Sequence, residues 1–312
     1  MLSPIVLFVY NRPWHTQQTI EALQKNDLAL QSDLIIYSDA PKNESGKRAV
    51  QDVRRYIKGV EEGFKTISIV ERDENWGLAN SIIDGVTSIV NEFGRIIVLE
   101  DDLVTSPFFL RYMNEALDFY QDDDRVISIH GWMWPHKNKN NFSPFFLKGA
   151  DCWGWATWKR GWDLFDSDGE KMLSILNAEP LAIRKIFDFN GEVQYIKMLE
   201  QQIAGKNDSW AIRWYASAFL NEKLTLHPGI SLVQNIGNDS SGTHCSTTDL
   251  FKVPLAETSI DIKNIPVNED INMRKEAEEY YKNIQPSFLQ RGFSMLDRLF
   301  GTRQLKRYVS GK

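Results

Sequence analysis

Short apolar runs alternate with amphipathic stretches through the first 130 residues, and this alternation limits the possible fold more than any other feature. Five runs are mostly apolar, as in strands covered on both faces: PIVLFVY (4–10), DLIIYSDA (33–40), KTISIVERD (65–73), RIIVLEDD (95–102) and RVISIHGW (125–132). Helical patterns separate them, at 12–25, 44–60, 77–93 and 106–122. Strands separated by helices predict an α/β fold with a mostly parallel central sheet and flanking helices.

The composition excludes several classes of protein. The 312 residues carry a formal net charge of −6, and 42% are hydrophobic and 25% charged, which is ordinary for a globular chain. An acidic chain does not fit a general nucleic-acid binder, which would be basic. The two cysteines, Cys152 and Cys245, give neither a disulfide framework nor a zinc-binding spacing. The first apolar run is too short for a membrane span and lacks a basic leader, so we expect a cytoplasmic protein.

The rest of the chain has a different character. Six of the ten tryptophans lie between Trp132 and Trp162. Helical patterns follow from 167 to 204 and from 273 to 283. The last 26 residues, 287–312, carry six basic side chains against one acid, with phenylalanine and leucine at roughly helical spacing. Such a segment suits an anionic membrane surface, and it equally suits a terminal helix packed on the domain or on a partner subunit.

Polar residues stand where the predicted parallel strands end. Asn11 and Arg12 follow the first strand, Asp39 ends the second, and the acidic triplet Glu100-Asp101-Asp102 ends the fourth. Ligands of such sheets bind beyond the carboxyl ends of the strands. Three adjacent carboxylates suit a hard divalent cation with oxygen ligands, and a solvated acidic turn is the plainer interpretation. The triplet alone leaves both open.

The ordered set NRP (11–13), SDA (38–40), LEDDL (99–103), WGWATWKRGW (153–162) and DSW (208–210) resembles the GT-A glycosyltransferases. Among these, the chain is most similar to the animal Golgi enzyme N-acetylglucosaminyltransferase I and to related bacterial sugar transferases. The resemblance extends from VYNRP to NIGNDSSGTH, over about three quarters of the chain. It implies a Rossmann-like nucleotide-sugar transferase fold, with the acidic triplet in place of the more common Asp-x-Asp motif.

The resemblance assigns roles to residues at the strand ends. Asp102 would ligate Mn²⁺ or Mg²⁺, Asp101 would face the ribose, and the first acid of the triplet would support the turn. Arg12 would approach the diphosphate, since a forked guanidinium suits phosphate oxygens. Asp39 would accept a hydrogen bond from uracil, and Asn80 is a further nucleotide contact. Taken alone, Arg12 is equally a surface arginine at a helix start and Asp39 a helix cap.

The tryptophan-rich segment has two interpretations. Flat aromatic faces and backbone amides in a glycine-spaced turn suit a sugar ring, which makes Trp153, Gly154 and Trp155 candidates for sugar binding. A tryptophan-rich core is the alternative. Trp158 and Trp162 are spaced by four, which predicts one face of a helix and a place in the core.

Displacement at an anomeric carbon with inversion needs a carboxylate that takes the proton of the attacking hydroxyl. The resemblance places Asp208 in this role, with Ser209 where the relative has a second aspartate; a helix cap is the alternative for Asp208. His244, in a Gly/Ser-rich loop, is a further candidate metal ligand. His130 follows the fifth strand and faces the acceptor side if it has a role, and His227 reads as structural.

These features favour an inverting, metal-dependent transferase of a UDP-sugar to a glycan or lipid-linked saccharide, in bacterial surface polysaccharide or glycolipid synthesis. Its basic tail would allow peripheral membrane association. Residues 1–130 would bind the nucleotide-sugar, 131–250 would form the acceptor-binding and catalytic half of the same domain, and 251–312 would be an extension. The alternatives are a sugar nucleotidyltransferase, which usually begins with a glycine-rich loop that LFVYNRPWHT lacks, and a non-catalytic carbohydrate-binding protein.

Overall fold

The computed structural model describes residues 1–135, 143–239, 248–262 and 265–284. Within this part of the chain, eight strands form one sheet in the order β3-β2-β1-β4-β8-β6-β9-β7. The strands of this sheet are β1 (Ile5–Val9), β2 (Asp33–Ser38), β3 (Thr66–Glu71), β4 (Arg95–Glu100), β6 (Val126–His130), β7 (Phe145–Lys148), β8 (Trp155–Trp158) and β9 (Leu224–His227). A separate antiparallel ribbon joins β5 (Leu103–Thr105) to β10 (Val233–Asn235).

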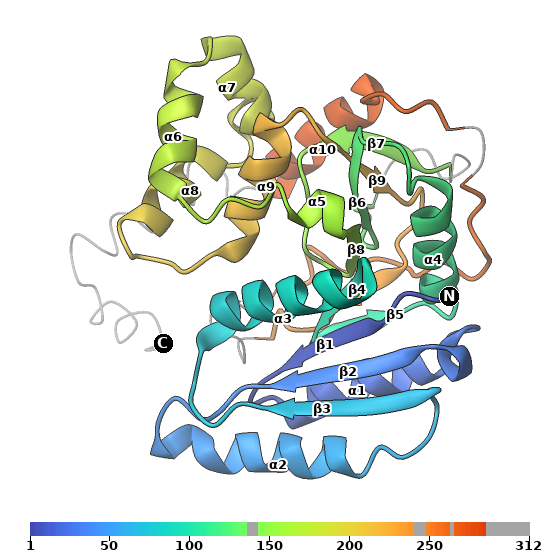
Figure 1. Cartoon of the computed structure of the whole chain (residues 1–312). Helices are drawn as coiled ribbons and strands as arrows, with labels where there is room; N and C mark the ends of the chain where they lie inside the picture. Colours follow the sequence, from blue (N-terminus) through green and yellow to red (C-terminus); the bar gives the residue numbers. More distant parts are fainter. Residues whose placement is uncertain (136–142, 240–247, 263–264, 285–312) are drawn as a thin grey trace, which may run out of the picture.

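The first four strands of the sheet are parallel, and Figure 1 shows the arrows of β1, β2 and β3 pointing the same way. Strand β8 then runs antiparallel to both of its neighbours, β4 and β6. Strand β9 is parallel to β6, and β7 closes the sheet antiparallel to β9. The carboxyl ends of β1, β2, β4, β6 and β9 and the start of β8 therefore share one edge.

Helices cover both faces of the sheet. They are α1 (Pro13–Gln24), α2 (Lys47–Lys58), α3 (Gly77–Phe93), α4 (Phe109–Phe119), α5 (Lys159–Trp162), α6 (Gly169–Ala178), α7 (Leu181–Phe187), α8 (Tyr195–Ile203), α9 (Trp210–Leu220) and α10 (Ile271–Ile284). Three short 3₁₀ turns lie at Ala29–Gln31, Glu44–Gly46 and Phe189–Gly191. Within the described residues, no helix combines the length and the apolar character that crossing a membrane requires.

Alternation along the strands divides the core into two layers. Ile5 and Leu7 of β1 pack in one buried cluster with side chains of α1, α2 and α4. Val6 and Phe8, which face the other way, pack with α3, α5 and α9. Both faces of the strand are thus apolar because both are covered, which is the reason for its unbroken apolar sequence.

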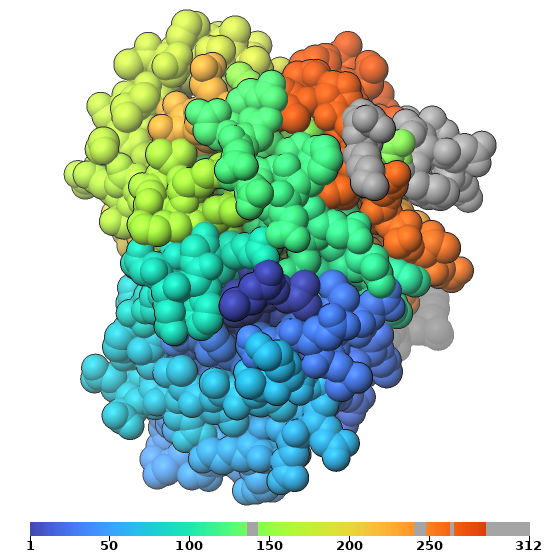
Figure 2. Space-filling view, turned by 45° about the vertical axis from the view of Figure 1, so that its right-hand side comes forward, coloured from blue at the N-terminus to red at the C-terminus, as the bar shows by residue number. Residues whose placement is uncertain are grey.

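The later residues join the same body. A third apolar cluster links α6–α9 with α10 and the aromatic residues that follow β6, and Figure 1 shows α6, α7 and α8 grouped at the upper left. In Figure 2 the blue N-terminal half and the green, yellow and orange later segments pack as one continuous surface. The dark-blue N-terminus lies against the teal segment there. Arg95 donates a hydrogen bond to the Met1 carbonyl oxygen.

The predicted α/β class, with a large, mostly parallel central sheet and flanking helices, is confirmed. One local expectation is wrong: Trp158 belongs to strand β8, not to a helix, and only Trp162 lies in α5. Both side chains are buried, as expected, but on opposite faces of the sheet. Of the C-terminal segment, α10 lies in the described part, and the basic stretch 287–312 lies outside it.

Candidate functional site

The carboxyl edge of the parallel strands brings Arg12, Asp101 and Asp102 together. Arg12 follows β1, and the two acids follow β4, which is the direct neighbour of β1 in the sheet. The Arg12 guanidinium donates a hydrogen bond to Asp101 and lies 2.9 Å from an Asp102 carboxylate oxygen. Pro13 at the first position of α1 starts the helix directly after Arg12, because its fixed φ suits a first helical turn.

Buried charge dominates this edge. Asp101 is 4% exposed and Asp102 6%. Burial raises the pKa of Asp101 despite the charge of Arg12. Although burial opposes it, the charges of Asp101 and Asp102 raise the pKa of Arg12 above its ordinary value. Such a paired cluster persists only where the geometry repays the loss of hydration.

Glu100 adds a third acid to this cluster. Loss of hydration, together with the charges of Asp102 and Asp101, raises the pKa of Glu100 to about 8. Glu100 is therefore mostly protonated at neutral pH, and a divalent cation with oxygen ligands beside these carboxyl groups would favour its charged form. The donor set of the acidic turn fits Mn²⁺ or Mg²⁺ in its chemistry.

A segment about 135 residues later in the sequence contacts Asp102. The ribbon β5–β10 brings residues 236 and 237 to the acidic turn, and the Ile236 N–H donates to the Asp102 carbonyl oxygen at 2.8 Å. A Cβ atom on Gly237 would lie 2.0 Å from the nearer Asp102 carboxylate oxygen. Only glycine therefore leaves that carboxylate in its present place.

If Asp102 holds a cation for a bound nucleotide, Gly237→Ala should weaken Mn²⁺-dependent UDP binding by about tenfold or more, because the added methyl group displaces the Asp102 carboxylate. Titration calorimetry with UDP and Mn²⁺ measures this. Gly59→Ala is the matched control, since its Cβ would meet only backbone oxygens at 3.4 Å or more, at the end of α2. Equal weakening of UDP binding in both variants would contradict a role for Asp102 in metal-dependent nucleotide binding.

Asp39 lies at the same edge but is already engaged. One carboxylate oxygen accepts from the N–H groups of Ala40 and Trp76, and the other accepts from Gly77 N–H and the Asn75 amide. Asp39, which directly follows β2, thus holds the turn at residues 75–77 that leads into α3. With four donors on two oxygens, little acceptor capacity is left for a base, so Asp39 is best placed to position the 75–77 turn.

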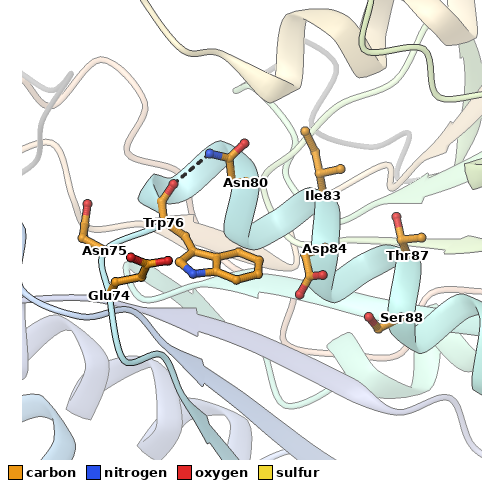
Figure 3. Close-up of a pocket in the computed structure, with 8 residues that line it drawn as sticks. All are labelled: Glu74, Asn75, Trp76, Asn80, Ile83, Asp84, Thr87 and Ser88. Carbon is orange, nitrogen blue, oxygen red and sulfur yellow. Dashed lines mark hydrogen bonds between the residues drawn. The ribbon is translucent and has the colours of Figure 1, made fainter.

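Asn80 lines a pocket of about 690 Å³ on the first turns of α3 and the turn before it, shown in Figure 3. Its amide donates to the Trp76 carbonyl oxygen at 3.0 Å, the dashed line of Figure 3. The Trp76 ring lies along the helix toward Asp84 in that view, and the Arg72 guanidinium stacks on it at 3.9 Å from the ring centroid. This pocket adjoins the turn that Asp39 holds.

The predicted sugar-binding tryptophans separate into two environments. Trp155 is 1% exposed and stacks on Trp210, so its ring belongs to the core. Trp153 is partly exposed, with its ring edge-on to that of Trp132 at 5.1 Å. Gly154 between them has φ +65°, and a Cβ there would lie 2.6 Å from a Val233 methyl group. The turn therefore requires glycine and exposes Trp153 while it buries Trp155.

Asp208 precedes α9 and does not cap it. Ser209 is the cap: its hydroxyl accepts from the Ile212 N–H. The Asp208 side chain is 69% exposed and lies 3.7 Å from Arg213. Two residues later Trp210 stacks on Trp155 at the start of β8, so α9 begins at the edge that carries the acidic turn.

Sequence reasoning missed a cluster at this edge, formed by His130, Asp151 and His227. The Nδ1 atoms of the two histidines lie 3.3 Å apart, and Asp151 Oδ2 lies 3.7 Å from His130 Nδ1. Burial lowers the pKa of each histidine to about 3, so both rings are neutral at physiological pH. A histidine at the end of the fifth strand was a usable signal; the parallel pairing of β6 with β9, which brings His227 beside it, was not. His244 lies outside the described residues.

No family model matches the chain, and no curated protein matches its sequence. Solved structures overlap with it weakly. The chain shares 11% identity with S. aureus TarS 1–349 (TM-score 0.37, 73% of this chain and 58% of that one). It shares 12% with the mannosyltransferase PcManGT from Pyrobaculum calidifontis, in complex with GDP-Man and Mn²⁺ (TM-score 0.37, 70% of each chain). With mouse xyloside xylosyltransferase 1 it shares 11% (TM-score 0.28, 43% and 53%).

The chain spans little more than half of the TarS 1–349 chain, and 38% of the same protein's chain solved with UDP. All of these likenesses have TM-scores below 0.5. The side chains at the carboxyl edge therefore carry the functional inference.

Proposed function

We propose that this protein is an inverting, metal-dependent glycosyltransferase of the GT-A fold that moves a sugar from a UDP-sugar to an acceptor hydroxyl. The observation that carries the proposal is the pairing of Arg12 with the buried Asp101 and Asp102, directly after Glu100, at the carboxyl edge of the parallel strands. A solvated acidic turn would not bury its acids, nor would a lectin need them at a nucleotide-binding edge.

Each member of the cluster has a role in holding a nucleoside diphosphate. Asp102 would ligate Mn²⁺ or Mg²⁺, Asp101 would face the ribose, and Arg12 would bind diphosphate oxygens with its forked donors. When bound, the cation would supply charge neutralisation for the departing diphosphate. Asp39 would hold the 75–77 turn against the base, with Asn80 in the adjoining pocket.

Asp208 would act as the base. As the acceptor oxygen forms its bond to the anomeric carbon, its proton passes to the Asp208 carboxylate, and the bond from that carbon to the diphosphate oxygen breaks with the electron pair going to the diphosphate. Attack from the side opposite the leaving group inverts the anomeric configuration. The exposure of Asp208 at the start of α9 leaves its carboxylate accessible to an acceptor.

Trp153 and Gly154 would line the sugar subsite, since Trp153 is partly exposed and Gly154 allows the tight turn beside it. Trp155 would support this turn from the core. The resemblance to N-acetylglucosaminyltransferase I makes a hexose or N-acetylhexosamine the expected donor sugar. We place the enzyme in bacterial surface polysaccharide or glycolipid synthesis, in the cytoplasm or at the inner face of the membrane, with a glycan or lipid-linked saccharide as acceptor.

The division of the chain follows from these roles. Residues 1–130 supply the nucleotide side, and 131–250 supply the base and the sugar subsite while adding β7, β8 and β9 to the same sheet. Residues 251–312 would be an extension of that single domain.

Calorimetry with UDP, with and without Mn²⁺, tests the proposal, followed by a screen of nucleotide sugars for Mn²⁺-dependent hydrolysis. We expect UDP binding to strengthen at least tenfold with Mn²⁺, because the metal and Arg12 share the diphosphate charge. Tight binding of a sugar polymer without nucleotide would favour a carbohydrate-binding protein. Formation of a nucleotide sugar from a nucleoside triphosphate and a sugar phosphate would favour a nucleotidyltransferase.

A further inference from the structure

Two imidazoles meet at the carboxyl ends of neighbouring parallel strands. His130 ends β6 and His227 ends β9, and the register of this pair (Ile129 opposite Leu226) places the two histidines side by side. Phe145 of β7 stacks on the His227 ring at 5.5 Å between centroids, which fixes the orientation of that ring. The sheet thus presents two ring nitrogens at a fixed separation.

That separation matches the edge of a metal tetrahedron. Two nitrogens bound at about 2.0–2.1 Å to one tetrahedral zinc ion lie roughly 3.3–3.4 Å apart, and the two Nδ1 atoms are 3.3 Å apart. Asp151 supplies a third donor: one atom from each of the three residues lies within 4.8 Å of the others. The Asp151 side chain is 38% exposed and belongs to the turn before β8, so the carboxylate reaches both the histidines and solvent.

Several features favour a bound metal ion over a histidine pair that is held only by its own hydrogen bond. Both rings are buried, which favours the neutral form that binds metals. His130 Nε2 has no hydrogen-bond partner among the described residues. No donor to Nε2 therefore fixes the ring proton on Nδ1, and Nδ1 is able to present its lone pair to a metal ion. The carboxylate of Asp151 makes no ion pair with lysine or arginine in the described part of the chain.

We propose that His130, Asp151 and His227 form a site for zinc, or a similar transition-metal ion, with a fourth position open to water. The site differs from the acidic turn in its chemistry, because imidazole ligands suit zinc whereas carboxylate and carbonyl oxygens suit manganese and magnesium. A bound ion would tie the turn that carries Trp153 and Gly154 to the ends of β6 and β9. This inference stands independently of the proposed transferase activity.

The two sites are close neighbours. In the sheet, β8 lies between β4 and β6, so the Asp151–Cys152 segment that leads into β8 lies between the acidic turn and the histidine pair. In keeping with this, burial and then the charges of Glu100, Asp151 and Asp102 raise the pKa of the Cys152 thiol. An experiment must separate the two sites by their ligands, not by activity.

Cobalt(II) offers that separation, because tetrahedral Co²⁺ absorbs far more strongly in the visible than the octahedral hydrated ion. The full-length protein, freed of metal with a chelator, is titrated with CoCl₂ and then with ZnCl₂. We expect a visible band that saturates at one equivalent, disappears on adding zinc and persists in excess MnCl₂. His227→Gln and Asp151→Asn should weaken cobalt binding by at least tenfold, whereas Asp102→Asn should leave the band unchanged.

Circular dichroism confirms that each variant is folded. Asp151 is partly exposed, so Asp151→Asn keeps the experiment decisive if a change at buried His227 prevents folding. The proposal is overturned if the wild-type protein gives no band, as expected of two imidazoles that only hydrogen-bond to each other. It is equally overturned if the band survives in Asp151→Asn with unchanged affinity, or if it is lost in Asp102→Asn.

Discussion

Asp102→Ala is expected to lower Mn²⁺-dependent turnover of the nucleotide sugar by roughly 10²–10³-fold, the loss typical when a group that stabilises transition-state charge is removed. The carboxylate is buried beside Arg12 at the end of β4, and its removal leaves the cation without its proposed protein ligand. The fold should persist, because Arg12 keeps its hydrogen bond to Asp101. Release of UDP from the best donor of the screen gives the rate.

Asp123→Ala is the matched control for this variant. Asp123 also pairs with an arginine, Arg125, but it lies just before β6 at the opposite end of the strand. Its loss should leave turnover within about twofold of wild type. If Asp102→Ala turns over donor at the wild-type rate while circular dichroism shows a native fold, the acidic turn has no part in the chemistry.

Asp208→Asn is expected to bind UDP and Mn²⁺ normally while transferring sugar about 10²–10⁴ times more slowly, the range associated with general base catalysis. The amide keeps the size of the side chain but does not accept the proton. Because Asp208 is exposed and Ser209 caps α9, the substitution should leave the melting temperature almost unchanged. Calorimetry with UDP and a transfer assay on the same preparation separate binding from chemistry.

Ser209→Ala distinguishes a base from a cap. Loss of the Ser209 hydrogen bond to Ile212 N–H should cost about 1 kcal/mol of stability and leave the transfer rate close to wild type. The Asp208 assignment fails if Asp208→Asn transfers sugar as fast as the wild-type protein does.

The parallel half of the fold was predictable because each of its strands is apolar on both faces. Val6 and Leu7 pack in different clusters, so β1 reads as an unbroken apolar run. The antiparallel strands β7 and β8 have no comparable unbroken apolar run that predicts a strand. In β8, Trp155 and Trp158 enter opposite layers, and with Trp162 they form a spacing of three and four that resembles a helix.

The convergence of Arg12 with Asp101 and Asp102 was predictable for a simple reason: the carboxyl ends of neighbouring parallel strands meet at one edge. The histidine cluster was not. His130 and His227 are 97 residues apart and meet only because β6 pairs with β9. Asp151 reaches them only because β8 is inserted between β4 and β6. Local sequence patterns do not encode such long-range pairings.

The direction of β8 limits how this site can vary in evolution. Because the strand runs antiparallel, the chain reaches the ligand edge through the segment 149–154 before it enters the sheet. Both ends of that segment are pinned: the Gly149 N–H donates to the Lys223 carbonyl oxygen, and a Cβ on Gly149 would lie 2.3 Å from the Tyr215 ring. Gly154 is equally confined against Val233. Insertions or deletions there would displace Asp151 and Trp153 between the two pinned ends, so related proteins should diversify this rim by substitution at constant length.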